Sequence, residues 1–297
     1  MMTGLPLEQV RTLLAAADEG TFEAAARALH VTPSAVSQRI RALEERTGRV
    51  LLLRSKPIRL TDSGEVVVRF ARQVARLERD AGAELGLPGS GEPARVSIAV
   101  NADSLATWFL PALAHAGREG RICLEVHRED EEHTTRLLRE GTVMAAVTSS
   151  PQPVQGCSVR ALGRMRYRAM ASPDFVDRWL GGAPLRQLLG AAPVVVFDRR
   201  DELQDRFLHR LNPRATPGAL RHFVPASESY LDAVVSGLGW GMLPEIHVAA
   251  RAVGGRLRDL APDRPIDVPL YWQQWKLDSP ALAEVADAVA AAAADAL

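Results

Sequence analysis

The chain has 297 residues, which is too many for one small domain and suits two or three compact units of roughly 100–150 residues each. Lysine plus arginine and aspartate plus glutamate both number 36, so the formal net charge of zero excludes a strongly basic or acidic protein. All apolar runs are shorter than the roughly 18–20 residues of a membrane span, and the N-terminus lacks the profile of a signal peptide. We therefore expect a cytoplasmic protein with no membrane partner.

The sequence contains no recognisable catalytic or metal-binding pattern. The two cysteines, Cys123 and Cys157, are far apart and belong to no motif, whereas metal sites usually pair cysteine or histidine at short spacing. We expect both to be buried thiols in a reducing compartment. No serine lies in a GxSxG elbow, and no cysteine and histidine can be paired from their spacing. The sequence therefore predicts neither an enzyme nor a bound metal or cofactor.

Residues 5–60 are dense in helix formers with short breaks between them and predict a small helical domain. Leu5–Ala17 has the apolar spacing of a first helix, and Thr21 can cap a second. Thr32 caps a third helix, and Pro33 occupies its first position, where a missing N–H costs nothing. A second and third helix joined by a short turn are typical of a helix-turn-helix.

The third helix carries side chains suited to reading DNA. Its spacing turns Val36, Ile40 and Leu43 inward. Small residues at its start permit close approach to a major groove, glutamine can read adenine, and arginine can read guanine or hold phosphate. The candidate DNA contacts on and beside this helix are Thr32, Pro33, Ser34, Ser37, Gln38, Arg39 and Arg41.

Two short β-type runs follow, Val50–Arg54 and Ile58–Leu60, and predict a hairpin that forms a wing. Residues 27–59 hold eight basic and two acidic residues, whereas residues 1–26 hold one basic and four acidic residues. A basic stripe on a neutral protein is typical of a phosphate-binding surface. A three-helix packing module whose arginines are merely solvated is the alternative, and the wing and the charge polarity favour DNA. The wing residues available to phosphate or a minor groove are Arg54, Lys56 and Arg59.

Residues 62–87 predict one long linker helix that begins at Thr61 or Ser63. Apolar residues at alternating three- and four-residue steps form a seam of the kind found in short coiled coils, which favours a dimer over packing on the chain's own domain. The seam residues are Val67, Phe70, Val74, Leu77 and Ala81. The chain thus divides into a DNA-binding domain over 1–61, the helix over 62–87, a Pro- and Gly-containing hinge over 88–93, and a regulatory domain over 94–297.

From Arg95 onward, strand-type runs alternate with helical patterns and predict an α/β domain with a mainly parallel sheet. The runs are Val96–Val100, Ile122–Val126, Val143–Val147, Val194–Phe197 and Leu270–Trp272. Ligands of such domains bind outside the carboxyl ends of the strands. This rule selects as candidate effector contacts Asn101, Asp103, Ser104, Trp108, Glu125, Asp130, Thr148, Asp198, Ser227 and Glu228.

The candidate contacts are rich in carboxylates, which favours a ligand with more than one cationic group, such as a basic amino acid. Two alternatives remain open for individual residues. An Asp or Ser at the start of a helix is often only a cap, and Trp108 can equally belong to the core.

The run over residues 24–44, together with Arg54 and Leu60–Gly64, closely resembles the LysR-type transcriptional regulators, and the resemblance covers the full length. The run Val100–Trp108, followed by Leu110–Leu113, resembles the lysine- and arginine-responsive LysG/ArgP branch of that family. The resemblance implies a winged helix-turn-helix, a linker helix and a two-lobed α/β effector domain like that of periplasmic binding proteins. It implies a first lobe over about 94–165 and 268–297, and a second over about 166–267.

The resemblance also implies what the protein does. It implies a homodimer, or a tetramer of two dimers, on double-stranded DNA with a partly palindromic operator. Lysine, arginine or histidine is the implied effector, RNA polymerase the partner, and activation of a gene for basic amino-acid export the outcome. Two rivals are a ligand-independent nucleoid or replication-associated DNA-binding protein, and a binding protein or enzyme with an accessory helical module.

Overall fold

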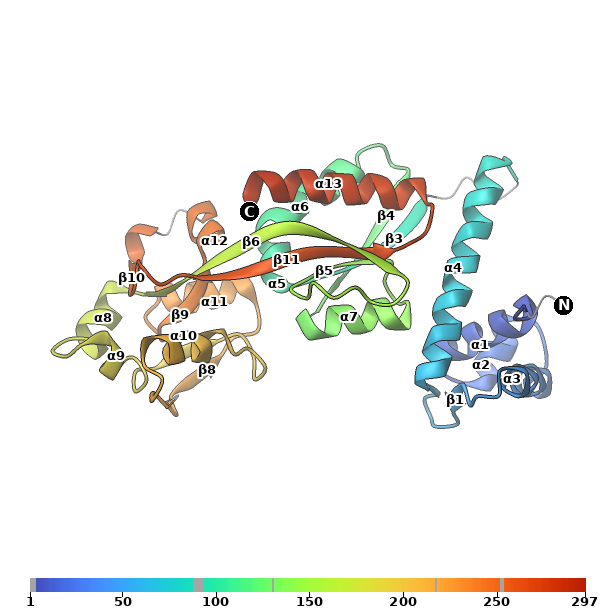
Figure 1. The fold of residues 1–297 in the computed structure, drawn as a ribbon, viewed down its shortest axis with the longest axis horizontal. Helices are drawn as coiled ribbons and strands as arrows, with labels where there is room; N and C mark the ends of the chain where they lie inside the picture. Colours follow the sequence, from blue (N-terminus) through green and yellow to red (C-terminus); the bar gives the residue numbers. More distant parts are fainter. Residues whose placement is uncertain (1–3, 88–92, 130, 217, 252–253) are drawn as a thin grey trace.

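The computed structural model describes residues 4–87, 93–129, 131–216, 218–251 and 254–297. Three helices, a hairpin and the start of a long fourth helix pack together at the N-terminus (Figure 1). We call residues 4–61 the N-terminal domain and residues from 94 onward the C-terminal domain. The N-terminal elements and the long helix are α1 (Leu7–Glu19), α2 (Phe22–Ala28), α3 (Pro33–Thr47), β1 (Leu52–Leu53), β2 (Arg59–Leu60) and α4 (Asp62–Glu84).

Threonine side chains begin three of these helices. The hydroxyls of Thr21, Thr32 and Thr61 each accept a hydrogen bond from the backbone N–H three residues ahead, which satisfies a donor that the first turn of a helix leaves open. The caps and the hairpin are confirmed. So is the inward face of α3, because Val36, Ile40 and Leu43 are fully buried.

The long helix α4 differs from its prediction in one respect. The apolar spacing predicts Val67 for the seam with a second copy, but Val67 is buried in the core of the N-terminal domain with Val68 and Ala71. The first turns of α4 serve as a wall of that domain, so only the rest of the apolar stripe stays exposed. Phe70 is 38% exposed and Leu77 45%. The helix ends at Glu84, and most of the predicted hinge, 88–92, lies outside the described residues.

The C-terminal domain is built on one seven-stranded sheet. Strand order is β10-β6-β11-β5-β3-β4, and β9 pairs with β6. The strands are β3 (Ala94–Val100), β4 (Ile122–Arg128), β5 (Ala145–Thr148), β6 (Cys157–Ala171), β9 (Gly241–Pro244), β10 (Arg258–Asp259) and β11 (Ile266–Trp275).

The sheet is mixed, so the expectation of a mainly parallel sheet was wrong. Only the pairings of β3 with β4 and β5 are parallel, and all pairings of β6 and β11 are antiparallel. The 15-residue strand β6 was not predicted, because arginines at its outward positions interrupt the apolar run. Of β11, the strand that returns beside β6, only the centre was predicted.

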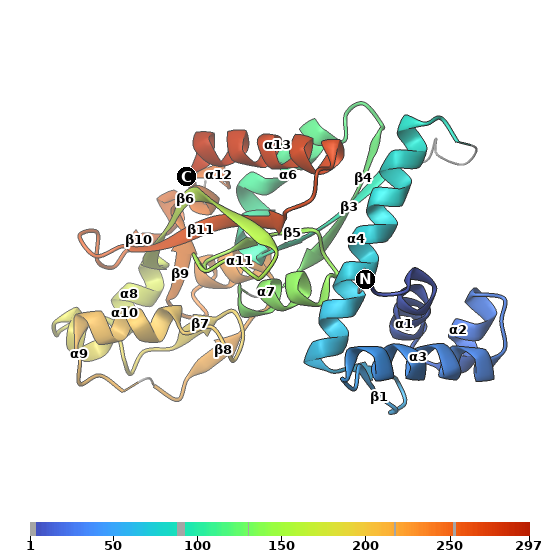
Figure 2. The same ribbon diagram turned by 45° about the vertical axis from the view of Figure 1, so that its right-hand side comes forward.

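These two long strands join the lobes (Figure 1). Around the first lobe, α6 and α13 cover one face of the sheet and α7 the other (Figure 2). Met165 on β6 pairs in register with Val268 on β11. The two predicted lobe boundaries, 165/166 and 267/268, therefore lie next to the same pair of residues. The boundaries themselves remain a prediction. The helices of this lobe are α5 (Ala102–Ser104), a π-helix (Leu105–Phe109), α6 (Leu110–Ala116), α7 (Glu131–Glu140) and α13 (Pro280–Ala296).

The second lobe holds a small parallel pair of strands, β7 and β8, with helices around it. Tyr230 anchors this lobe, because its buried hydroxyl donates to the carbonyl of Val195 at 2.9 Å and accepts from the N–H of Met242 at 3.1 Å. The elements are α8 (Pro173–Trp179), α9 (Leu185–Leu188), β7 (Val194–Val196), α10 (Leu203–Leu211), β8 (Arg221–Phe223), α11 (Ser227–Val235), α12 (Glu245–Ala250) and a 3-10 turn (Gly254–Arg256).

The cysteines divide between core and surface. Cys157 is buried as expected, but Cys123 is exposed, which corrects the expectation of two buried thiols. The reason is topological, since β4 is the edge strand and its outward positions face solvent. Among the described residues, no helix is both long and apolar enough to cross a membrane.

Candidate functional sites

The outer face of α3 presents a row of polar side chains to solvent. Ser34, Gln38 and Arg41 are exposed and Ser37 is half-buried. Pro33 is exposed in the first turn, and the Thr32 hydroxyl accepts the N–H of Ala35 at 3.2 Å. Arg39 is different, because its guanidinium pairs with Glu8 of α1 at 2.5 Å. Arg39 therefore ties α3 to α1, whereas its neighbours stay available to a ligand.

The wing adds a second cationic surface. The side chains of Arg54, Lys56 and Arg59 are exposed, and none of them forms a hydrogen bond or ion pair to another described residue of the chain. Cations without internal partners keep their donors for phosphate oxygens. We call Ser34, Ser37, Gln38, Arg41, Arg54, Lys56 and Arg59 the reading surface.

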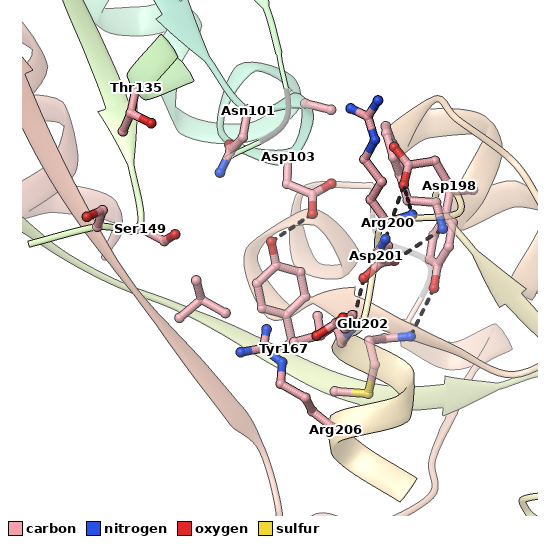
Figure 3. A pocket seen from close by; sticks show the side chains of 17 residues that line it. Asn101, Asp103, Thr135, Ser149, Tyr167, Asp198, Arg200, Asp201, Glu202 and Arg206 are labelled. Atoms are coloured by element: carbon pink, nitrogen blue, oxygen red, sulfur yellow. Dashed lines mark hydrogen bonds between the residues drawn. The ribbon is translucent and has the colours of Figure 1, made fainter. Parts of the chain in front are cut away.

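A pocket of about 780 Å³ lies between the two lobes (Figure 3). The first lobe contributes the end of β3, the middle of α7 and the loop after β5, and the second contributes the loop between β7 and α10. Tyr167 and Val268 of the long strands line the pocket between the lobes. The lining polar residues are Asn101, Asp103, Thr135, Ser149, Ser150, Tyr167, Asp198, Arg200, Asp201, Glu202, Arg206 and Tyr230.

Asp103 connects the two lobes. One carboxylate oxygen accepts the hydroxyl of Tyr167 and the other accepts the hydroxyl of Ser227 on α11, both at 2.7 Å. Burial raises the pKa of the Asp103 carboxyl above its ordinary value, although the two hydrogen bonds act in the opposite direction. A half-buried carboxylate that lines a pocket attracts a cation more strongly than one in water does.

Two further carboxylates shape the wall from the second lobe. Asp198 accepts the backbone N–H groups of Arg200 and Asp201, at 2.7 and 3.1 Å. Asp201 in turn accepts the N–H of Leu203 at 2.9 Å, at the start of α10. These bonds fix the loop that carries the charges. With Glu202, the pocket is lined by four carboxylates and by the guanidiniums of Arg200 and Arg206.

Comparison with known proteins assigns both parts of the chain. The family model of bacterial regulatory helix-turn-helix proteins of the lysR family matches residues 7–65. The model of the LysR substrate binding domain matches residues 89–294, which is more than half of the chain. The chain belongs to the LysR family of transcriptional regulators.

Relatives of this LysR-family regulator match it over almost its whole length. HTH-type transcriptional regulator LysG of Mycobacterium tuberculosis is 46% identical over 96% of this chain and 92% of its own. Lysine export transcriptional regulatory protein LysG of Corynebacterium glutamicum is 43% identical over 97% and 98%. HTH-type transcriptional regulator ArgP of Pseudomonas aeruginosa is 40% identical over 96% and 95%. All are named as regulators and none as an enzyme.

Two solved structures of the Corynebacterium LysG match the fold. Full-length LysG with bound effector arginine is 40% identical, with a TM-score of 0.85 over 98% of this chain and 99% of that one. A second structure of full-length LysG, also 40% identical and covering 99% of each chain, has a TM-score of 0.61. The two LysG chains therefore differ in overall arrangement.

The pocket of this LysR-family regulator brings together some of the predicted effector contacts. Asn101, Asp103 and Asp198 line it. Ser227 lies behind it as a partner of Asp103, and Thr148 lies beside it, its hydroxyl accepting the N–H of Ser150 at 3.1 Å. Asp130 lies outside the described residues.

Four predicted contacts lie away from the pocket wall. Ser104 and Trp108 are buried in the turns that follow Asp103, and Trp108 packs edge-to-face on Phe109 at 5.6 Å, so it is a core residue. Glu125 is exposed on the edge strand β4, 3.5 Å from His127. Glu228 is exposed in the first turn of α11. Proximity to a strand end selected these residues, but it does not determine which way a side chain points.

Several residues that line the pocket were not predicted from the sequence. Asp201, Glu202 and Arg206 follow Asp198 closely, and the charged run after the strand was the signal that could have revealed them. Tyr167 had no such signal, because it lies within the unrecognised strand β6. Thr135 lies in the middle of α7, where the strand-end rule does not apply.

Proposed function

We propose that this regulator binds a basic L-amino acid (lysine, arginine or histidine) between its lobes and thereby controls transcription of a gene for basic amino-acid export. The observation that carries the proposal is the interlobe pocket with four carboxylates. The arginine bound to LysG and the lysine-export name of that relative support the choice of ligand and target.

The pocket offers partners for every charged group of such a ligand. The hydroxyls of Thr135 and Ser149 and the guanidinium of Arg206 provide donors for an α-carboxylate. Asp103 and Asp198 provide acceptors for the cationic groups. Because these side chains come from both lobes, a ligand that touches all of them favours the closed arrangement of the lobes over the open one.

The reading surface is proposed to contact DNA in two ways. Gln38 and Ser34 lie where side chains reach base edges in a major groove, and the cations of α3 and the wing lie where they reach phosphate. Two copies joined through the exposed apolar stripe of α4, which includes Phe70 and Leu77, present two such surfaces to a partly palindromic operator in the cytoplasm. Pairing of dimers and contact with RNA polymerase complete the proposal.

Thermal unfolding of the full chain against a panel of amino acids tests the ligand. A ligand that binds only the folded state stabilises it by RT ln(1 + [L]/Kd), about 2.7 kcal/mol at a hundredfold excess over Kd. We expect the midpoint to rise with arginine, lysine or histidine, but not with leucine or glutamate. No shift with any of the three basic amino acids would overturn the effector assignment.

A pair of variants tests the site. Asp198→Asn removes a charge from the pocket but keeps an oxygen for the two backbone N–H groups of its loop. Loss of a hydrogen bond to a charged group, about 1.5–3 kcal/mol, predicts a loss of arginine affinity of roughly ten- to hundredfold. Glu125→Gln, which removes a carboxylate outside the pocket, is the matched control. Equal affinities of the two variants would contradict the proposed site.

Footprinting on DNA with and without arginine separates the rival function. A ligand-responsive regulator is expected to protect a defined operator, with a footprint that changes when arginine is added. Broad binding to bent or AT-rich DNA that ignores arginine would favour a ligand-independent architectural protein instead.

A further inference from the structure

One face of α4 carries three arginines that point to the C-terminal domain rather than to solvent. Arg69, Arg72 and Arg76 follow one another at steps of three and four residues and so share a face of the helix. Arg69 donates to the carbonyl of Arg139 at 3.2 Å, and Arg72 to the carbonyl of Glu140 at 3.0 Å. Arg69 and Arg72 therefore both donate hydrogen bonds to the C-terminal end of α7.

This end of α7 is suited to a cation. The last carbonyls of a helix lack partners within the helix and carry the negative end of its dipole, and the two guanidiniums supply donors and positive charge at that point. Gly141, which follows the helix with a φ of +76°, lets α4 approach closely. A Cβ on Gly141 would lie 3.0 Å from the Cα of Arg69. The backbones of α4 and of the residue after α7 are thus in close contact, with no room for a side chain between them.

The same helix forms part of the pocket wall. Thr135 of α7 lines the pocket (Figure 3). It lies four residues before Arg139, which is about 6 Å along a helix axis. Leu138 is fully buried in the core of the first lobe. It lies one residue before Arg139, where the end of α7 that contacts α4 begins; we call residues 139–141 the docking end. One helix with a packed inner face therefore touches the pocket and, roughly one turn further on, α4.

Arg72 reaches a third element. Besides its bond to Glu140, its guanidinium pairs with Asp18 of α1 at 2.5 Å. The adjoining turns of α4 hold Val67, Val68 and Ala71 in the core of the N-terminal domain. A shift of α4 against α7 must therefore either move the N-terminal domain as well or break the contacts of Arg72.

We propose that α7 and Arg72 couple the pocket to the reading surface: a ligand against Thr135 shifts the docking end of α7, and Arg72 transmits the shift to Asp18 and α1. The coupling rests on the proposed function, because it needs a ligand in the pocket. The two LysG structures differ in overall arrangement, which shows that a protein of this fold adopts more than one arrangement. Because coupling between two binding sites is reciprocal, DNA must alter arginine affinity by the factor by which arginine alters DNA affinity.

The test is hydrogen exchange of α1, α4 and α7 in the full chain, with and without saturating L-arginine. Arg72→Gln and Asp18→Asn are compared with wild type, and Arg79→Gln, which changes an exposed arginine of the same helix, is the control. Asp18 is half exposed, so its variant is expected to fold even if Arg72→Gln proves unstable. Calorimetry with arginine on each protein measures binding separately.

We expect arginine to alter exchange in α7, α4 and α1 of wild type and of Arg79→Gln. In Asp18→Asn and Arg72→Gln, arginine should still bind and still alter α7, but the change in α1 should be lost. An α1 response that persists in both variants would overturn the coupling, as would arginine binding to wild type without any change in α4. If calorimetry detects no binding to wild type, the proposed function fails first and the coupling fails with it.

Discussion

The arginines of the reading surface and those of α4 have the same guanidinium in opposite surroundings. The side chains of Arg41 and Arg54 are exposed, and neither forms a hydrogen bond or ion pair to another described residue. Arg76 is 3% exposed and donates to Asp80 on its own helix, to the carbonyl of Arg95 and to the hydroxyl of Ser279.

The difference distinguishes two uses of one residue type. A guanidinium whose donors are open to solvent can exchange water for phosphate, and its removal leaves nothing unsatisfied in the fold. A buried guanidinium whose N–H groups are hydrogen-bonded within the protein stabilises the fold. Its removal leaves several buried acceptors without a donor. Arginine content alone, which is what a sequence displays, does not separate the two.

The largest expected effect is the loss of stability when the buried arginine Arg76 is removed. Arg76→Ala leaves Asp80 and two further acceptors without their partner, and removal of one member of a buried pair predicts a loss of unfolding free energy of about 3 kcal/mol. Arg79→Ala, three residues along on the exposed face, should change it by less than about 0.5 kcal/mol. Chemical unfolding of both variants at one protein concentration measures the difference. Equal losses would show that burial does not separate the two kinds of arginine.

A smaller effect is expected at the reading surface, with no change in stability. Arg54→Ala should weaken DNA binding about equally for all sequences and lower the slope of log affinity against log salt by about 1, as expected for one lost phosphate contact. Gln38→Ala should instead relax discrimination at one base pair, by about 1–3 kcal/mol. Titration of operator and mutated operator over a range of salt distinguishes the two. A change of salt slope in Gln38→Ala alone would reverse the assignment.

The smallest effect concerns Asp103 and pH. Because burial raises the pKa of Asp103 in the folded state, the native protein holds a proton that the unfolded chain has released, but only at pH values between the two pKa values. The stability linked to this proton is present below the ordinary aspartate pKa and is lost as pH rises through the raised value. Asp103→Asn removes this dependence, so its stability relative to wild type should increase as pH rises through the raised pKa.

Thermal unfolding of Asp103→Asn and wild type from mildly acidic to neutral pH measures this trend, with Glu125→Gln as an exposed control. Parallel curves for wild type and Asp103→Asn would refute the role of burial. Arginine affinity of Asp103→Asn should fall at the same time, which separates the pocket charge from the stability effect.

The two regions also differ in how far the sequence reveals them. In the N-terminal domain the signals lie close together in the sequence. Thr32 caps a helix that begins at the next residue, and the apolar spacing of Val36 and Ile40 identifies the buried face. Its helices, caps and hairpin, and the exposed face of α3, could therefore be predicted almost completely. Arg39 is the exception, because its partner Glu8 lies on another helix.

The pocket is formed by residues that are far apart in the sequence, and only part of it was predictable. The strand-end rule found Asn101, Asp103 and Asp198, which follow β3 and β7 directly. It could not find Tyr167, whose place depends on a strand that crosses between lobes. It also selected Glu125, which lies outside the pocket, because a sequence does not show that β4 lies at the sheet edge.

The length of α4 makes it a lever arm. A helix of 23 residues is about 35 Å long. Tilting it by a few degrees moves its far end by about 2 Å, whereas a hydrogen bond to a base or phosphate tolerates only a few tenths of an ångström. If two copies pair through α4 as proposed, a tilt of a few degrees is therefore enough to make or break such bonds at one end of the helix.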